Sequence, residues 1–305
     1  MPDRTALPEP GGTFRWQPEL WGFSLRSRRL GEAAAHLFTT RQLRLRGEGG
    51  EARKGWEQAA ASIGLDGAHV ARLKQVHGTD VVVLRNGGRL VSEDEGLPEA
   101  DILVSDDPSI ALAVQVADCL PVLLADPRTG AVAAAHAGWR GTAAGAAAAA
   151  VHALVRQFGS RPEDLVAALG PGIGPCCYQV GAELLDAFAA AGHSRDELDR
   201  WFSPDGAPAN GTASRAGARP RLRLDVWTAN RDQLLAAGLR PENIDVAELC
   251  TATHVASFCS YRAEGPGTGR MAGIIRARAR GSWQLTVDRR RDRQAPGARS
   301  LRVPR

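Results

Sequence analysis

The stretch ALAVQVADCLPVLLADPRTGAVAAAHAGWRGTAAG, residues 111–145, decides the fold. Its apolar runs are short and are bounded by turn residues, a pattern typical of buried strands. The alanine-rich segment that begins at its end predicts one long helix over Thr142–Phe158. The three predicted strands are Ala111–Val116, Val122–Ala125 and Val132–Ala135.

Reactive side chains lie at the ends of these strands. The turn after the first strand contains Asp118 and Cys119, and His136 follows the third strand. A thiol and an imidazole that meet at one end of a sheet would form a reactive site. The alternative is that Cys119 is a small core residue and His136 a hydrogen-bonded histidine at a strand end.

Strands and helices mix along the rest of the chain without strict alternation. This pattern predicts an α/β fold, a single domain with a mixed β-sheet and flanking helices. We expect residues 1–30 to be loosely ordered and residues 31–288 to form the catalytic domain. Within that domain, residues 203–220 are rich in Gly, Ala and Pro and predict an insertion loop.

Composition and charge narrow the class of protein. The 305 residues are 44% hydrophobic and 24% charged, as in ordinary globular proteins. No signal peptide or transmembrane segment is evident, and five cysteines are expected to be reduced thiols, so we predict a cytoplasmic protein that does not bind membranes. The formal charge of +4 arises from the tail: residues 289–305 carry seven arginines and one aspartate. We expect a disordered basic tail and infer no nucleic-acid binding from it.

The segment GPGIGPCCY, residues 170–178, follows a predicted strand and precedes a predicted helix. Such a turn can cradle an anion on its backbone amides, but it matches neither the GxGxxG nor the P-loop pattern. The adjacent Cys176 and Cys177 match no CxxC metal spacing, and we expect no disulfide between them.

A third candidate residue, His77, lies upstream at a break between two predicted strands. Two imidazoles and one thiolate are ligands that zinc prefers, and three protein ligands leave a fourth position for water or substrate. His77 lies 42 residues before Cys119, and His136 lies 17 residues after it, which matches no local zinc-finger spacing. Spacing alone therefore does not identify a metal site.

Five blocks of sequence stand out: QVHGTDV (75–81), ADCLPVLLAD (117–126), AAAHAGWRGT (133–142), GPGIGPCCYQVG (170–181) and SYRAEGPGTGRMAGII (260–275). Together they resemble the laccase-domain family, whose bacterial members are called polyphenol oxidases or YfiH-like purine nucleoside phosphorylases. They occur in the order found in that family and span most of the chain between residues 38 and 275. One departure follows Arg41, where QLRLRGEGG replaces the Gly-Gly-x-Ser stretch and the Asn of the family.

The resemblance implies a metal-dependent enzyme. The ligands of that family fall on His77, Cys119 and His136, with zinc as the expected metal and copper as the alternative. The implied substrates are purine nucleosides and phosphate. The implied reactions are phosphorolysis of adenosine, inosine and 5′-methylthioadenosine, and deamination of adenosine.

Other residues receive roles from these expectations. Zinc with an open position would activate water for deamination, and Asp118 would be the proton shuttle or, if it points away from the metal, a supporting residue. Arginines are suited to phosphate because their planar fork binds it through two nitrogens. We expect Arg140 to be catalytic and Arg41, Arg262 and Arg270 to bind phosphate or nucleoside, with salt bridges or carbonyl contacts as the alternative roles. Gln75 is a candidate for the purine edge.

Three other functions remain open. A copper-dependent polyphenol oxidase would need more histidines than the matching motifs supply. A hydrolase with Cys119 as nucleophile and a histidine base would use the same residues without a metal. A metal-stabilised module could bind nucleosides without turnover. The sequence leaves the preferred nucleoside and the oligomeric state undetermined.

Overall fold

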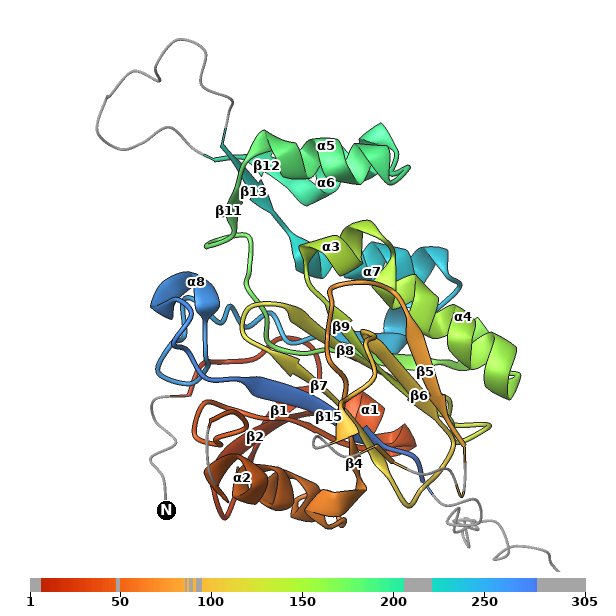
Figure 1. The fold of residues 1–305 in the computed structure, drawn as a ribbon. Coiled ribbons are helices and arrows are strands. Elements are labelled where there is room, and N and C mark those ends of the chain that lie inside the picture. The colour runs from red at the N-terminus through yellow and green to blue at the C-terminus, as the bar shows by residue number, and fades with distance from the viewer. Residues whose placement is uncertain are drawn as a thin grey trace, which may run out of the picture.

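The computed structural model describes residues 7–47, 50–85, 87, 90–91, 95–205 and 221–278. Two six-stranded sheets are stacked face to face, and helices cover both outer faces (Figure 1). The first sheet has the order β1-β2-β3-β15-β7-β4, and the second has the order β14-β10-β8-β9-β6-β5. Both contain parallel and antiparallel pairs. The predicted α/β class with flanking helices is confirmed, and the strands divide between two large sheets.

The first sheet is assembled from both ends of the chain. Its strands are β1 (Phe14–Glu19), β2 (Gly22–Ser27), β3 (Ala35–Phe38), β4 (Val70–Ala71), β7 (Ala111–Val116) and β15 (Met271–Arg276). Helix α2 (Gly50–Ala61) covers its outer face, with Trp56 and Ala59 packed against strand residues such as Ile274. The short helix α1 (Arg28–Ala33) connects β2 to β3.

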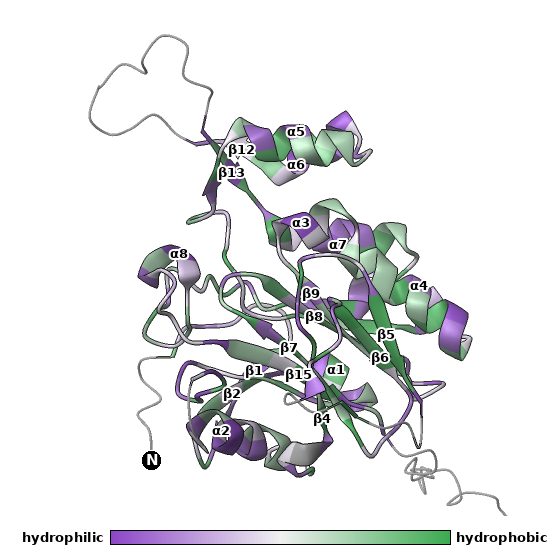
Figure 2. Ribbon diagram, in the orientation of Figure 1, coloured by the Kyte–Doolittle hydropathy of each residue, from purple (hydrophilic) through white to green (hydrophobic). Residues whose placement is uncertain are grey.

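The second sheet is covered by helices α4 and α7. Its strands are β5 (Val81–Leu84), β6 (Ile102–Ser105), β8 (Leu120–Ala125), β9 (Val132–Ala137), β10 (Val166–Leu169) and β14 (Ile244–Val246). The helices on this side are α3 (Trp139–Ala143), α4 (Ala146–Phe158) and α7 (Val226–Ala236). Figure 2 shows hydrophobic residues concentrated in β5 and β6 and hydrophilic ones on α2. Alanines of α4 pack on β9, so small side chains let this helix lie close to the sheet.

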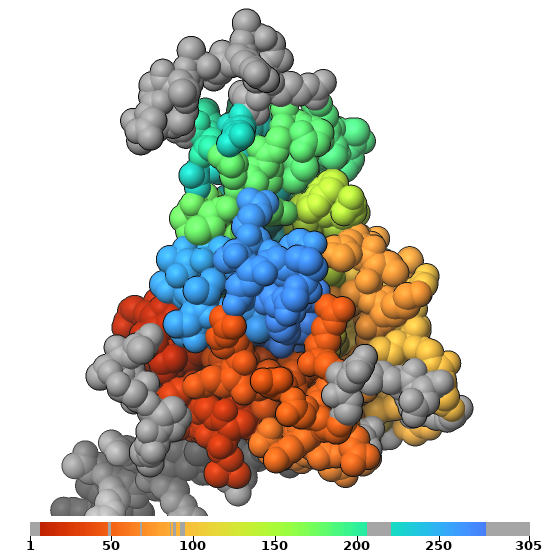
Figure 3. All heavy atoms as spheres, turned by 60° about the vertical axis from the view of Figure 1, so that its left-hand side comes forward, coloured from red at the N-terminus to blue at the C-terminus, as the bar shows by residue number. Residues whose placement is uncertain are grey.

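A third, small sheet forms a separate cluster with two helices. It contains β11 (Gln179–Val180), β12 (Phe202–Pro204) and β13 (Leu222–Leu224), and the helices are α5 (Ala182–Ala190) and α6 (Arg195–Trp201). Phe188 and Trp201 are fully buried at its centre. In Figure 3 the C-terminal part of the described chain, which includes α8 (Tyr261–Glu264), lies between this cluster and the N-terminal half.

The expectation of a loosely ordered segment over residues 1–30 is wrong for residues 14–27. These form a two-stranded hairpin with six consecutive pairs, from Phe14 opposite Ser27 to Glu19 opposite Gly22. Phe14 and Leu25 are fully buried in the core between the sheets. The burial of these two side chains holds the hairpin in place, although β1 is an edge strand with mostly polar residues.

The predicted helix over 142–158 is broken into α3 and α4. Gly145 has φ +83°, a conformation that glycine adopts without strain, and it separates the two helices. Most of the predicted insertion, from residue 206 to residue 220, and the whole predicted tail 289–305 lie outside the described residues. Among the residues that are described, no helix has the length and apolar character required to cross a membrane.

Candidate metal centre and substrate cavity

The three predicted metal ligands come together. One ligand atom each of His77, Cys119 and His136 lies within 4.8 Å of the others. The two imidazole rings have centroids 4.9 Å apart and are inclined by 71°. His77 lies on the connection from β4 to β5 and Cys119 on the connection from β7 to β8, so both stand where the chain passes from the first sheet to the second.

Backbone geometry presents these side chains. His77 has φ +65° and Asp118, next to Cys119, has φ +87°, both in the left-handed region that non-glycine residues seldom adopt. Gly138 leaves room for the cluster: a Cβ atom there would lie 2.9 Å from Cys119 Sγ and 3.0 Å from His77 Cδ2. The positive φ angles and the missing side chain are consistent with a backbone shaped around these ligands.

Asp101, which the sequence analysis did not identify, supports the centre by hydrogen bonds to the turn that carries His77 and to His136. Its fully buried carboxylate accepts hydrogen bonds from the amides of Val76 (3.2 Å), His77 (3.0 Å) and Gly78 (2.6 Å). It also pairs with His136 Nδ1 at 2.7 Å. With Nδ1 donating to Asp101, the Nε2 lone pair of His136 is available to a metal. The only sequence signal is an acidic residue directly before an apolar strand.

Electrostatics favour a charged thiolate. Burial acts to raise the pKa of Cys119, but the charge and hydrogen bonds of His136 and His77 outweigh it, and the pKa falls to about 6. Burial acts to lower the pKa of His136, but the Cys119 thiolate and Asp101 raise it to about 9. A soft thiolate between two imidazoles fits zinc or copper, because both accept sulfur and nitrogen donors.

The centre lies on the wall of a cavity of about 640 Å³, within the range of small-molecule sites. Aromatic side chains of Trp139, Tyr178 and Tyr261 line it. They lie in the sequence blocks 133–142, 170–181 and 260–275, but the sequence analysis assigned them no role. They offer flat apolar surfaces for a heteroaromatic ring.

Two of the predicted arginines line this cavity. Arg262 Nη1 donates to the carbonyls of Cys177 (3.3 Å) and Gln179 (2.9 Å), and its guanidinium lies 5.2 Å from the centroid of the Tyr178 ring. Arg270 Nη1 donates to the carbonyls of Thr268 (3.2 Å) and Gly269 (2.9 Å). These carbonyl contacts occupy the Nη1 nitrogen of each guanidinium group. Nη2 of either arginine makes no hydrogen bond or ion pair with any residue that the structure describes.

The other two predicted arginines lie elsewhere. Arg140 is exposed, is stacked over Trp139 at 4.3 Å and does not line the cavity. Arg41 lines a second cavity of about 280 Å³, together with Arg44, Arg46 and Arg270. Its guanidinium pairs with Glu264 at 2.9 Å. Arg270 belongs to both cavities, so the second cavity adjoins the first.

Asp118 and Gln75 line the main cavity, but their polar atoms already have partners. The Asp118 carboxylate accepts from Thr251 Oγ1 and from the Arg262 amide, both at 2.6 Å. The Gln75 amide makes two hydrogen bonds with the backbone of Gln115, at 2.7 and 2.8 Å. Both side chains therefore connect separate segments of the cavity wall.

Residues 40–278 match the family model described as multi-copper polyphenol oxidoreductase laccase. The chain belongs to this family. Within it, a purine nucleoside phosphorylase of Deinococcus radiodurans is 38% identical over 216 residues, covering 71% of this chain and 73% of the relative. Adenosine deaminase RL5, from an unknown prokaryotic organism, is 33% identical over 221 residues, covering 71% and 79%. The crystal structure of YfiH from Bacillus licheniformis superposes with a TM-score of 0.75 at 28% identity, covering 88% of this chain and all of that one.

Proposed function

We propose that this protein is a zinc-dependent purine nucleoside phosphorylase that also deaminates adenosine. The observation that carries the proposal is the position of the His-Cys-His centre in a cavity that Arg262 and Arg270 also line. Relatives named purine nucleoside phosphorylase and adenosine deaminase support both activities. Zinc at this centre would supply Lewis-acid chemistry and activate water near neutral pH.

The two arginines are assigned to phosphate. A phosphate dianion needs N–H donors and positive charge, and the unpaired Nη2 nitrogens of Arg262 and Arg270 provide both. The aromatic residues Trp139, Tyr178 and Tyr261 would hold the purine by stacking. The ribose would then lie between the base and the phosphate, where its anomeric carbon can be attacked as the bond to the purine breaks.

Asp118 is assigned a positioning role. Its carboxylate connects Thr251 to the backbone of Arg262, so it fixes the start of α8, from which Arg262 projects. Proton transfer by Asp118, the other expected role, would use a lone pair that these two hydrogen bonds leave free. The expected roles of Arg140 and Arg41 in catalysis and substrate binding, and that of Gln75 at the purine edge, stay predictions, to be tested by substitution.

The test is product analysis of zinc-loaded protein with adenosine, with and without phosphate. Adenine and ribose 1-phosphate that form only with phosphate would establish the phosphorylase, and inosine that forms without phosphate would establish the deaminase. His77→Ala should lose bound metal and both activities together. If folded, metal-loaded protein forms neither product, the proposal is refuted.

A copper oxidase is less well supported by the donor atoms. All seven histidines are among the described residues, and only His77 and His136 share a group with metal-ligand geometry there. His36 is buried and its ring nitrogens contact the backbone at Ser27 and Ala34. Oxidation by several coppers needs further histidine ligands that this arrangement does not provide.

A thiol hydrolase is the second candidate, because the lowered pKa of Cys119 and its neighbouring imidazoles would also suit a nucleophile and its base. It predicts that metal-free protein is active and that alkylation of Cys119 abolishes this activity. Loss of all activity on removal of the metal would exclude it.

A further inference from the structure

Three of the five cysteines gather at a place that the proposed function does not use. Cys176 and Cys177 lie on the Gly-Pro turn between β10 and β11, and Cys250 follows β14. The three sulfur atoms lie within 4.8 Å of one another, and Sγ of Cys176 is 3.7 Å from Sγ of Cys177. A bridge between Gly172 and Cys250 holds the two segments in register.

The spacing fits a metal bound by thiolates. Zinc–sulfur bonds are about 2.3 Å long, so sulfurs on a trigonal or tetrahedral ion lie about 3.8 to 4.0 Å apart. Cys250 is buried, Cys177 half-buried and Cys176 exposed, which provides a deep ligand and an open side for entry. A donor set made only of sulfur selects soft ions.

The Thr253 hydroxyl lies within hydrogen-bonding distance of two of these sulfurs. Thr253 Oγ1 lies 3.2 Å from Cys177 Sγ and 3.5 Å from Cys176 Sγ. Thiolates are the form that binds metal, so the ion must displace a proton from Cys176, whose pKa burial raises to about 11.

Two guanidinium groups flank the same turn. Arg223 Nη1 donates to the carbonyls of Pro175 (3.0 Å) and Cys176, and Arg262 Nη1 donates to that of Cys177. Arg223 also pairs with Asp205 at 2.7 Å, so part of its charge is already offset. Together they fix the backbone that carries two of the thiols and add positive charge near them.

We propose that Cys176, Cys177 and Cys250 form a second metal site, which takes one thiophilic d¹⁰ ion, Cu⁺ or Zn²⁺. Each thiol that binds gives up its proton to solvent. The ion fastens the turn that leads to Tyr178 to the segment that leads to Thr251. Both residues belong to the surroundings of the main cavity, so the site supports one of its walls. The proposal does not depend on which reaction the cavity catalyses.

The test counts bound ions in the reduced, full-length protein. Protein is loaded with Zn²⁺ in one arm and with Cu⁺ in another, desalted, and analysed for metal. In the arm whose ion the second site binds, we expect two equivalents of bound metal in the wild type. We expect one equivalent in Cys119→Ser and none in Cys119→Ser/Cys177→Ser. Cys259→Ser, a buried cysteine outside both clusters, should keep two equivalents and serves as the control.

A second measurement on wild-type protein guards against variants that fold poorly. Alkylation followed by mass spectrometry should show Cys176 and Cys177 protected when the second equivalent of metal is bound, and modified after a chelator removes it. If the second equivalent binds in only one of the two loading arms, that arm identifies the ion. Absence of bound metal from folded Cys119→Ser in both arms, or a disulfide among the three cysteines that persists in the metal-loaded protein, would overturn the proposal.

Discussion

Replacing Asp101 by Asn should weaken metal binding without leaving a cavity in the core, because the two side chains have nearly the same shape. The carboxylate accepts four N–H donors, two on each oxygen: His77 N and His136 Nδ1 on Oδ1, and Val76 N and Gly78 N on Oδ2. An Asn side chain has one oxygen. Whichever way the amide lies, two donors face an N–H group.

The magnitude follows from those two donors. A buried donor without an acceptor costs about 1 to 3 kcal/mol. Allowing for partial relaxation around the amide, we expect the free energy of unfolding of the metal-free Asp101→Asn protein to fall by about 2 to 4 kcal/mol. Loss of the carboxylate behind a metal-ligating histidine lowers metal affinity by about 10- to 100-fold. The Kd for Zn²⁺, measured by competition with a chromogenic chelator, should therefore rise by that factor.

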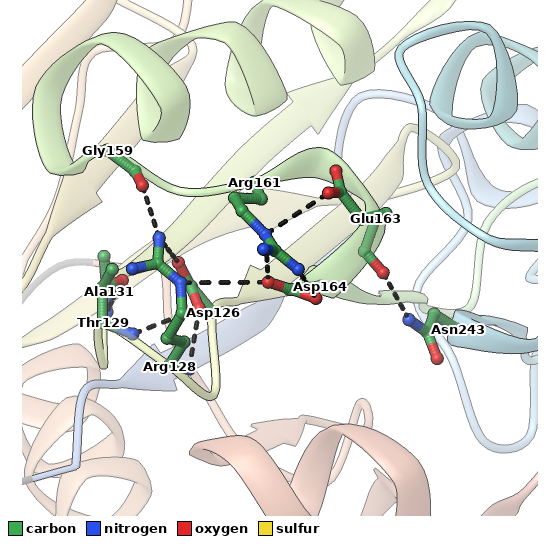
Figure 4. A network of polar contacts seen from close by, with 9 residues as sticks. All are labelled: Asp126, Arg128, Thr129, Ala131, Gly159, Arg161, Glu163, Asp164 and Asn243. Carbon is green, nitrogen blue, oxygen red and sulfur yellow. Dashed lines mark hydrogen bonds and ion pairs between the residues drawn. The ribbon is translucent and has the colours of Figure 1, made fainter.

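Asp126→Asn is the matched control. Asp126 is also fully buried and accepts from backbone amides, those of Arg128 (2.7 Å) and Thr129 (3.1 Å), in the network of Figure 4. It follows the far end of β8, whose six residues separate it from Cys119. At the usual rise per strand residue, that separation is about 20 Å. Both amides donate to Oδ1, so the single oxygen of an Asn side chain can accept both, and this variant should keep its Zn²⁺ affinity and lose less stability than Asp101→Asn. Equal Zn²⁺ affinities for wild type, Asp101→Asn and Asp126→Asn would refute the role assigned to Asp101.

Three further predictions follow from single residues. Gly138→Ala places a Cβ atom 2.9 Å from Cys119 Sγ, so Zn²⁺ affinity should fall at least about 10-fold, whereas Gly267→Ala, with nothing within 4 Å, should bind Zn²⁺ like the wild type. Burial lowers the pKa of His36 to about 4, below its ordinary 6.5. The unfolded chain therefore binds this proton first, and His36 alone should contribute about 2 kcal/mol less stability at pH 5 than at pH 8 in urea unfolding. His36→Gln should remove that part of the pH dependence, and an unchanged slope would contradict it. Arg270→Ala should lower kcat/KM for phosphate by about 100-fold and leave deamination, assayed without phosphate, within a factor of a few; equal losses in both reactions would contradict a phosphate-specific role.

The sequence predicted well those parts of the fold that depend on local pattern. Apolar runs at 111–116, 122–125 and 132–135 lie in β7, β8 and β9. The ligand set came from the family blocks and not from spacing, because the three ligands meet only when connections between two sheets are brought together. The division into two stacked sheets was not predictable from runs that are apolar on both faces.

Features that depend on long-range contacts were missed. Asp101 supports a turn 23 to 25 residues earlier, and its role is visible only when the backbone amides of that turn point at it. The hairpin over residues 14–27 is polar enough to suggest a loose segment, yet two buried side chains hold it. The break at Gly145 was hidden because alanine on both sides favours helix.

Two of the connections between the large sheets, from β4 to β5 and from β7 to β8, have a consequence for folding. His77 and Cys119 lie on separate crossings, so the ligands are brought together only when the two halves of the sandwich have docked. A partly unfolded species with one sheet detached would retain strands but could not hold the ion. An ion that binds only the docked state would add about 2.7 kcal/mol to its stability at a free concentration one hundred times its Kd. Metal release and separation of the sheets should then occur in one cooperative transition, whose midpoint rises with the free metal concentration.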